Sequence, residues 1–145
     1  MSIDIKTKET PTAQKLLGIR ATNTLKLVEK IEKGLPFSVF VRLRKRTGLP
    51  SDVLLETLGI KPRTFMRRKK TKAFTPEESD RLVSLSRLFA RIIALFEGDE
   101  DAARDWITKP NRALGGSTPL KFATTQTGTR EVENLIGRIE HGVFG

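Results

Sequence analysis

The segment from Thr75 to Phe96 constrains the fold most, because its helical pattern is apolar on most of its sides. Thr75-Pro76-Glu77-Glu78 is a helix start, with a threonine N-cap, a proline at the first helical position and a glutamate that completes a capping box. The apolar residues that follow are Leu82, Val83, Leu85, Leu88, Phe89, Ile92, Ile93, Leu95 and Phe96. A helix that packs against only one other element needs a single apolar stripe. We therefore expect either the central helix of a monomer or a helix that lends its outer face to a second copy.

Residues 51–72 predict a helix–turn–helix. Ser51 is a suitable N-cap for a short apolar helix that ends at Gly59, and Pro62 suits the first turn of a second helix. Phe65 and Met66 are expected to anchor this second helix. Its polar side chains, which would then project outward, are Arg63, Thr64, Arg67, Arg68, Lys69 and Lys70. A short basic helix anchored on a core fits the major groove of DNA.

The charge pattern favours DNA as the partner of this helix. Residues 61–72 hold seven basic residues and no acid, whereas an ordinary soluble surface mixes its signs. A solvated basic helix end is the alternative. Residues 1–96 hold 21 lysines and arginines against 9 acids, and residues 97–145 hold 6 against 8. Because phosphate neutralisation supplies most non-specific affinity for nucleic acid, the basic part indicates a polyanion. RNA fits less well, since Phe65 is the only aromatic residue in the basic helix.

Specific roles follow for the second helix of the motif. We expect Arg63 and Arg67 to approach bases, while Arg68, Lys69 and Lys70 hold phosphates. A symmetric operator needs two reading heads, so we also expect a homodimer built partly on the helix of residues 76–96. The residues assigned to that dimer interface are Leu82, Leu85, Phe89 and Ile92.

The rest of the chain reads as further helices. Asn23 or Thr24 caps a helix that stops at Gly34, Pro36 opens one that stops at Gly48, and Asp99 begins one that ends before Pro110. Thr118 caps a short helix, and Gly128 is expected to separate it from a last amphipathic helix. No segment shows the alternation of apolar and polar residues that is typical of a β-strand. The fold class is therefore all-α, with residues 1–20 as a mobile arm, residues 21–73 as the helix–turn–helix domain and residues 74–145 as a helical C-terminal domain.

Composition excludes several functions. The chain has no cysteine and one histidine, His141, so thiol chemistry and a multi-histidine metal site are excluded. The acids of residues 97–101 fit a helix start better than a calcium loop. We expect no enzyme, no cofactor and no metal. Without an apolar run for a membrane span or a signal peptide, we expect a cytoplasmic protein.

The second half resembles a known family of toxin-binding domains. The words that carry this resemblance are Phe96-x-Gly98-Asp99, Arg104-x-Trp106, Pro110-Asn111, Leu114-Gly115-Gly116-x-Thr118-Pro119-Leu120 and His141-Gly142-Val143, in that order. Together they look like the C-terminal domain of the Xre/MbcA/ParS antitoxins, over most of residues 75–145. The helix–turn–helix stands at the expected place.

The resemblance implies a type II antitoxin. Such proteins pair with a RES-domain toxin that consumes NAD, occlude its active site with their C-terminal region, dimerise, and repress their own operon. The residues that we then expect nearest the toxin are Arg138, Glu140, His141, Val143 and Phe144. A stand-alone helix–turn–helix repressor, whose C-terminal helices only dimerise, is the alternative.

Overall fold

The computed structural model describes residues 10–142, which form helices without a strand in that range. The isolated antiparallel bridge Pro36–Ala73 is the β-type pairing recorded there. The helices, in order along the chain, are α1 (Ala13–Leu17), α2 (Thr24–Lys33), α3 (Ser38–Thr47), α4 (Ser51–Leu58), α5 (Pro62–Thr71), α6 (Pro76–Leu95), α7 (Glu100–Thr108), the 3₁₀ helix η1 (Arg112–Leu114), α8 (Pro119–Phe122) and α9 (Gln126–Glu140). The predicted all-α fold class is confirmed.

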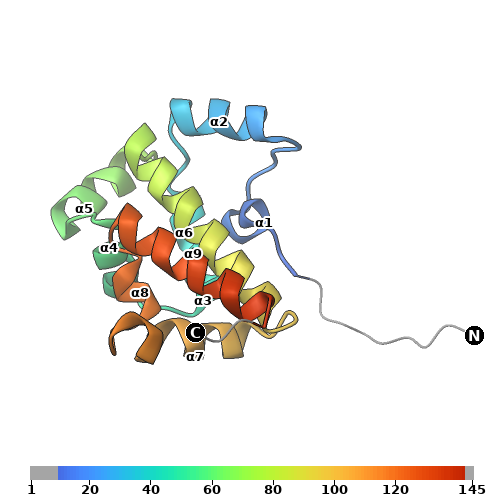
Figure 1. Cartoon of the computed structure of the whole chain (residues 1–145). Helices are drawn as coiled ribbons and strands as arrows, with labels where there is room; N and C mark the ends of the chain where they lie inside the picture. The colour runs from blue at the N-terminus through green and yellow to red at the C-terminus, as the bar shows by residue number, and fades with distance from the viewer. Residues whose placement is uncertain (1–9, 143–145) are drawn as a thin grey trace, which may run out of the picture.

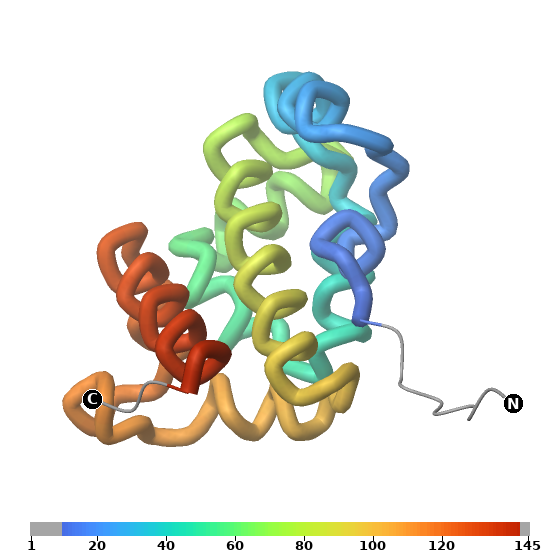
Figure 2. Tube along the Cα trace, turned by 45° about the vertical axis from the view of Figure 1, so that its right-hand side comes forward, coloured from blue at the N-terminus to red at the C-terminus, as the bar shows by residue number. Residues whose placement is uncertain are grey.

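Helix α6 is the central helix of the molecule. It contacts α1, α2, α3, α4, α7 and α9, and it runs between α1 on one side and α9 on the other (Figures 1 and 2). One continuous apolar cluster extends from Leu16 in α1 to Ile136 in α9. The two functional halves expected from the sequence therefore share a single core.

The central position of α6 overturns one expectation about dimerisation. The side chains assigned to a dimer interface are all at most 5% exposed within the monomer: Leu82, Leu85, Phe89 and Ile92. The interpretation of α6 as a helix that lends its outer face to a second copy is wrong, because its neighbours in the same chain cover both sides. The alternative, a central helix of the monomer, is confirmed.

The sequence suggested that residues 1–20 form a mobile arm, but residues 13–17 are helical in the structure. They form α1. The Thr12 side chain caps its start by accepting a hydrogen bond from the Lys15 N–H, and the helix ends at Gly18. Leu16 and Leu17 are fully buried, and α1 packs against α3 and α6. A helix this short is marginal alone, so burial of its leucines holds it in place. Residues 1–9, the rest of the expected arm, lie outside the described residues.

The predicted helix boundaries are mostly observed. Asn23, Asp99 and Thr118 each accept a backbone N–H as side-chain caps, and Thr75 and Glu78 form the complete capping box. Ser51 is the first helical residue and Pro50 occupies the cap position, a shift of one residue. Gly128 was expected to separate two helices, but it lies inside α9.

None of the helices in residues 10–142 has both the length and the apolarity needed to cross a membrane.

Candidate nucleic-acid interface and C-terminal partner surface

Helices α4 and α5 form the predicted helix–turn–helix, and Phe65 anchors its second helix. Helix α4 buries Leu54, Leu55 and Leu58. The Phe65 ring lies 5.1 Å from that of Phe37 and 4.7 Å from that of Phe40, measured between centroids. These contacts fix the orientation of α5 against α3.

Met66 does not share this anchoring role, although the sequence suggested that it would. Its side chain is 54% exposed. Phe65 is thus the aromatic residue that packs α5 against the core, and none of the residues in this helix is fully buried.

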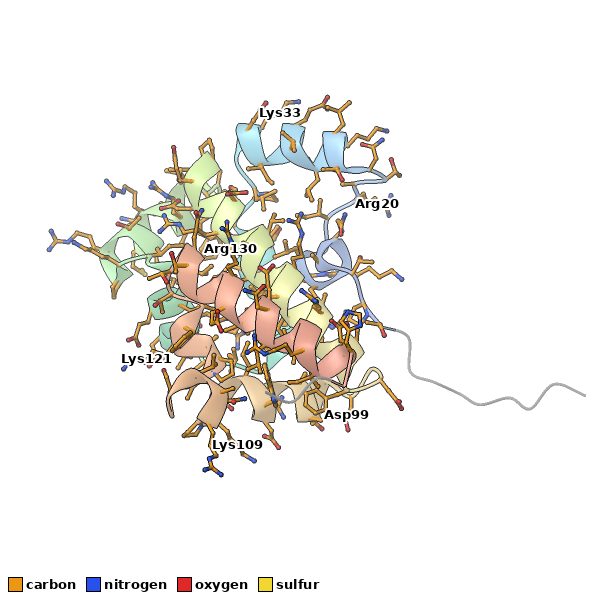
Figure 3. The ribbon with its side chains drawn as sticks, in the orientation of Figure 1. Arg20, Lys33, Asp99, Lys109, Lys121 and Arg130 are labelled. Atoms are coloured by element: carbon orange, nitrogen blue, oxygen red, sulfur yellow. The ribbon has the colours of Figure 1, made fainter. Side chains whose placement is uncertain are left out.

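The outer face of α5 is strongly basic. Arg63, Arg67, Lys69 and Lys70 are exposed, and Thr64 is half-buried. None of these four cations forms an ion pair with another residue in the described part of the chain. Figure 3 shows nitrogen-tipped side chains on α5 projecting away from the rest of the molecule. The arrangement presents positive charge without ion-pair partners on one short helix, which suits a phosphate backbone.

Arg68 differs from its neighbours, because it is paired inside the protein. Its Nε donates to Oε1 of Glu78 at 2.7 Å and its Nη2 donates to Oε2 at 3.1 Å. Both side chains are largely buried. This bidentate contact joins α5 to the first turn of α6, so we leave Arg68 out of the DNA-facing set to which the sequence had assigned it.

Glu78 also completes the start of α6. Its Oε1 accepts the backbone N–H of Thr75 at 2.9 Å. Burial alone would raise the pKa of the Glu78 carboxyl, but the hydrogen bonds from Arg68 and Thr75 outweigh burial and hold that pKa below its ordinary value. The carboxylate therefore stays ionised at neutral pH, which keeps the pair intact.

Sequence reasoning missed two cations that face the same side as α5. Arg42 and Lys45 in α3 line a groove together with Lys69 and Lys72. Their spacing of three residues, opposite the buried Phe40 and Leu43, could have indicated a second basic helix face.

The C-terminal surface predicted to meet a toxin is the last turn of α9. Nη2 of Arg138 lies 3.7 Å from Oε1 of Glu131, and Nη2 of Arg91 lies 2.8 Å from Oε1 of Glu140. His141 is exposed at the end of the helix. Because these ion pairs are more than a third exposed, they contribute little and can exchange partners. Val143 and Phe144, the other two predicted contacts, lie outside the described residues.

The segment rich in turn residues between α7 and α8 is a tight connection. Asn111 accepts the backbone N–H of Ala113 through its side chain and that of Gly116 through its carbonyl. Gly115 and Gly116 both have positive φ. The two glycines of the Leu114-Gly115-Gly116 motif are thus needed for the local backbone conformation.

Two family sequence models match the chain in this arrangement. The model described as the antitoxin Xre-like helix-turn-helix domain matches residues 26–87, and the one described as the antitoxin Xre/MbcA/ParS C-terminal toxin-binding domain matches residues 93–142. One match ends and the other begins within α6, so the central helix carries the join between the two parts.

Whole-chain comparisons agree with these matches. A protein of Yersinia enterocolitica named Antitoxin Xre is 36% identical over 129 residues, covering 88% of this chain and 87% of the relative. An Antitoxin Xre of Photorhabdus laumondii is 36% identical over 114 residues, covering 78% and 77%. The fold matches a chain in a crystal structure of the M. tuberculosis MbcT-MbcA toxin-antitoxin complex with a TM-score of 0.52 at 23% identity, covering 86% of this chain and all of that one. The chain therefore belongs to the Xre family of antitoxins.

Proposed function

We propose that this protein is the antitoxin of a type II toxin–antitoxin system, and that it neutralises a RES-type, NAD-degrading toxin by occluding the toxin's active site. The observation that carries the proposal is the match of residues 93–142 to a toxin-binding domain, together with relatives named antitoxins over most of the chain. Inhibition by occlusion requires no catalysis by the antitoxin itself.

The end of α9 is the proposed inhibitory surface. A toxin pocket that binds a dinucleotide should carry cations for the phosphates, and the carboxylate of Glu140 can pair with such a cation in place of Arg91. Arg138 and His141 flank this carboxylate, and Val143 and Phe144 follow it along the chain. The proposed contact thus combines one acid with two apolar side chains.

Co-expression with the toxin tests this surface. We expect a chain that ends at Gly142, and the double variant Glu140→Ala/His141→Ala, to give less protection against growth arrest and NAD loss than the full chain. Lys33→Ala is the matched control, since Lys33 lies on α2 at the opposite end of the molecule in Figure 3. Full protection by both altered chains would show that another surface inhibits the toxin.

We further propose that α5 binds operator DNA and represses the operon, with Arg63 and Arg67 at bases and Lys69 and Lys70 at phosphates. The free cations on its outer face support this assignment. Each bidentate arginine–base contact is worth about 1–3 kcal/mol of discrimination. Arg63→Ala and Arg67→Ala should therefore each weaken operator binding about tenfold in a fluorescence titration, and unchanged affinity would refute the assignment.

A homodimer remains part of this proposal, because a symmetric operator needs two reading heads. Its interface must avoid the core face of α6, which is filled within one chain. Light scattering at micromolar concentration should give a dimer mass without DNA or toxin, and a monomer mass would contradict the proposal.

A further inference from the structure

Lys72, at the end of α5, holds a backbone conformation that normally belongs to glycine. Its φ of 65° and ψ of 17° are left-handed, and its N–H donates to the Arg68 carbonyl at 2.7 Å to close the helix. Helices α1, α3 and α4 end in the same conformation, but each does so at a glycine. A lysine there carries strain that a glycine would avoid, so its side chain is the feature to explain.

The Lys72 side chain lines the groove between α3 and α5. This groove has a volume of about 660 Å³, with Phe37 and Val41 among its apolar lining residues and Arg42, Lys45, Lys69 and Lys72 as its cations. No carboxylate lines it, and none of the four cations forms an ion pair within residues 10–142. The groove therefore has apolar surface beside concentrated positive charge.

The backbone holds the two sides of the groove together. The Phe37 N–H donates to the Lys72 carbonyl at 2.9 Å, and the Phe74 N–H donates to the Leu35 carbonyl at the same distance. The start of α3 is thus tied to the end of α5. The backbone positions of Lys72 and of the α3 cations are therefore tied to each other.

We propose that this α3–α5 groove binds the sugar-phosphate backbone of duplex DNA, with Lys45, Lys69 and Lys72 holding phosphates. This inference rests on the proposed DNA binding and extends it from α5 to α3. Lysines bind phosphate as point charges, and Phe37 and Val41 offer apolar contact for deoxyribose. The strain at Lys72 is retained because the residue places a charge where glycine has none.

The substitution Lys72→Gly separates the two roles of the residue. Glycine relieves the backbone strain, so the melting temperature should stay the same or rise. Affinity for a labelled random-sequence duplex should fall severalfold at low salt, and the slope of log K against log salt should become shallower by about 0.9 for the lost phosphate contact. Lys45→Ala should weaken binding in the same way, and Lys72→Arg should preserve it.

Glu97 provides the matched control, since it is the other non-glycine residue with positive φ in the described chain and it is exposed. Glu97→Gly relieves similar strain and should leave the affinity for the duplex unchanged. If Lys72→Gly and Lys45→Ala both bind with wild-type affinity and salt slope, the groove inference is wrong while the α5 assignment stands. If the wild type binds no duplex even at low salt, the proposed DNA binding itself fails, and the inference falls with it.

Discussion

At the scale of single residues, Glu78 connects two helices through one side chain. Its side chain is 7% exposed, it accepts the backbone N–H of Thr75 at the start of α6, and it pairs with Arg68 of α5. The basic helix is thereby joined to the central helix by one buried carboxylate. Breaking a buried pair leaves the remaining charge without compensation, which costs more than the pair itself contributes.

We predict that Glu78→Gln lowers the free energy of unfolding by about 1–3 kcal/mol at pH 7. The folded-state pKa of Glu78 lies below its ordinary value, so its contribution is fully present above about pH 4.3 and is lost as pH falls through the lower folded-state pKa. Urea unfolding from pH 7 to pH 3 should therefore show the wild type and the variant converge in acid.

Two further variants sharpen this prediction. Glu78→Ala should cost about 1 kcal/mol more than Glu78→Gln, because glutamine can still complete a capping box and alanine cannot. Glu100→Gln removes an exposed pair with Arg46, so it should change stability by less than about 0.5 kcal/mol. Equal losses for Glu78→Gln and Glu100→Gln would contradict the structural role of the buried pair.

The capping box of α6 was readable from the sequence, whereas the partner of Glu78 was not. Thr75 and Glu78 are three residues apart, and that spacing alone defines the motif. Arg68 is one of seven cations in residues 61–72, and no local rule distinguishes the one that turns inward. Tertiary packing made that choice, as it did when it set Phe65 against Phe37 and Phe40 and left Met66 exposed.

At the scale of elements, α9 shows how a glycine can be misread. The sequence indicated a break at Gly128, since glycine commonly ends helices. In the structure Gly128 lies in the first turn of α9, and a β-carbon there would overlap the Phe122 carbonyl oxygen. Gly128 therefore permits the close approach of α8 and α9, a contact between elements that helical periodicity cannot reveal.

We predict that Gly128→Ala destabilises the protein by about 1–3 kcal/mol, because the obstructing atom belongs to the backbone and cannot rotate away. Gly137→Ala is the control in the same helix, where the added β-carbon would meet only the flexible Arg91 side chain at 3.5 Å. It should be neutral or should stabilise by up to about 1 kcal/mol through helix propensity. Thermal unfolding of both variants checks the contrast, which similar losses would refute.

At the scale of the whole molecule, the same fold places the basic helix and the proposed partner surface on one shared core. The composition of α6 predicted that it would be buried, but it could not distinguish burial within a monomer from burial between two copies. The deciding elements were α1 and α9, which cover opposite sides of α6 (Figure 2). Helix α1 has only five residues, and the residues around Leu16 and Leu17 in the sequence are mostly polar. Periodicity could therefore not reveal this helix.

The shared core also determines which truncations can test function. Val132, Leu135 and Ile136 from α9 are at most 6% exposed, and each buried side chain of this kind contributes about 1.5–3 kcal/mol. Removing all three would cost about 5–9 kcal/mol, comparable to the whole stability of a typical domain. A chain that ends at Arg130 should therefore lose its cooperative thermal transition, whether or not a toxin is present.

A chain that ends at Gly142 keeps these core residues and the pair of Arg91 with Glu140. Its melting temperature should lie within a few degrees of that of the full chain, as measured by circular dichroism. This contrast separates loss of the proposed inhibitory surface from loss of the fold, because only the truncation at Arg130 removes the packing against α6. A cooperative transition in the chain that ends at Arg130 would show that α1 to α8 form a stable core alone, and α9 would then be an appended partner-binding element.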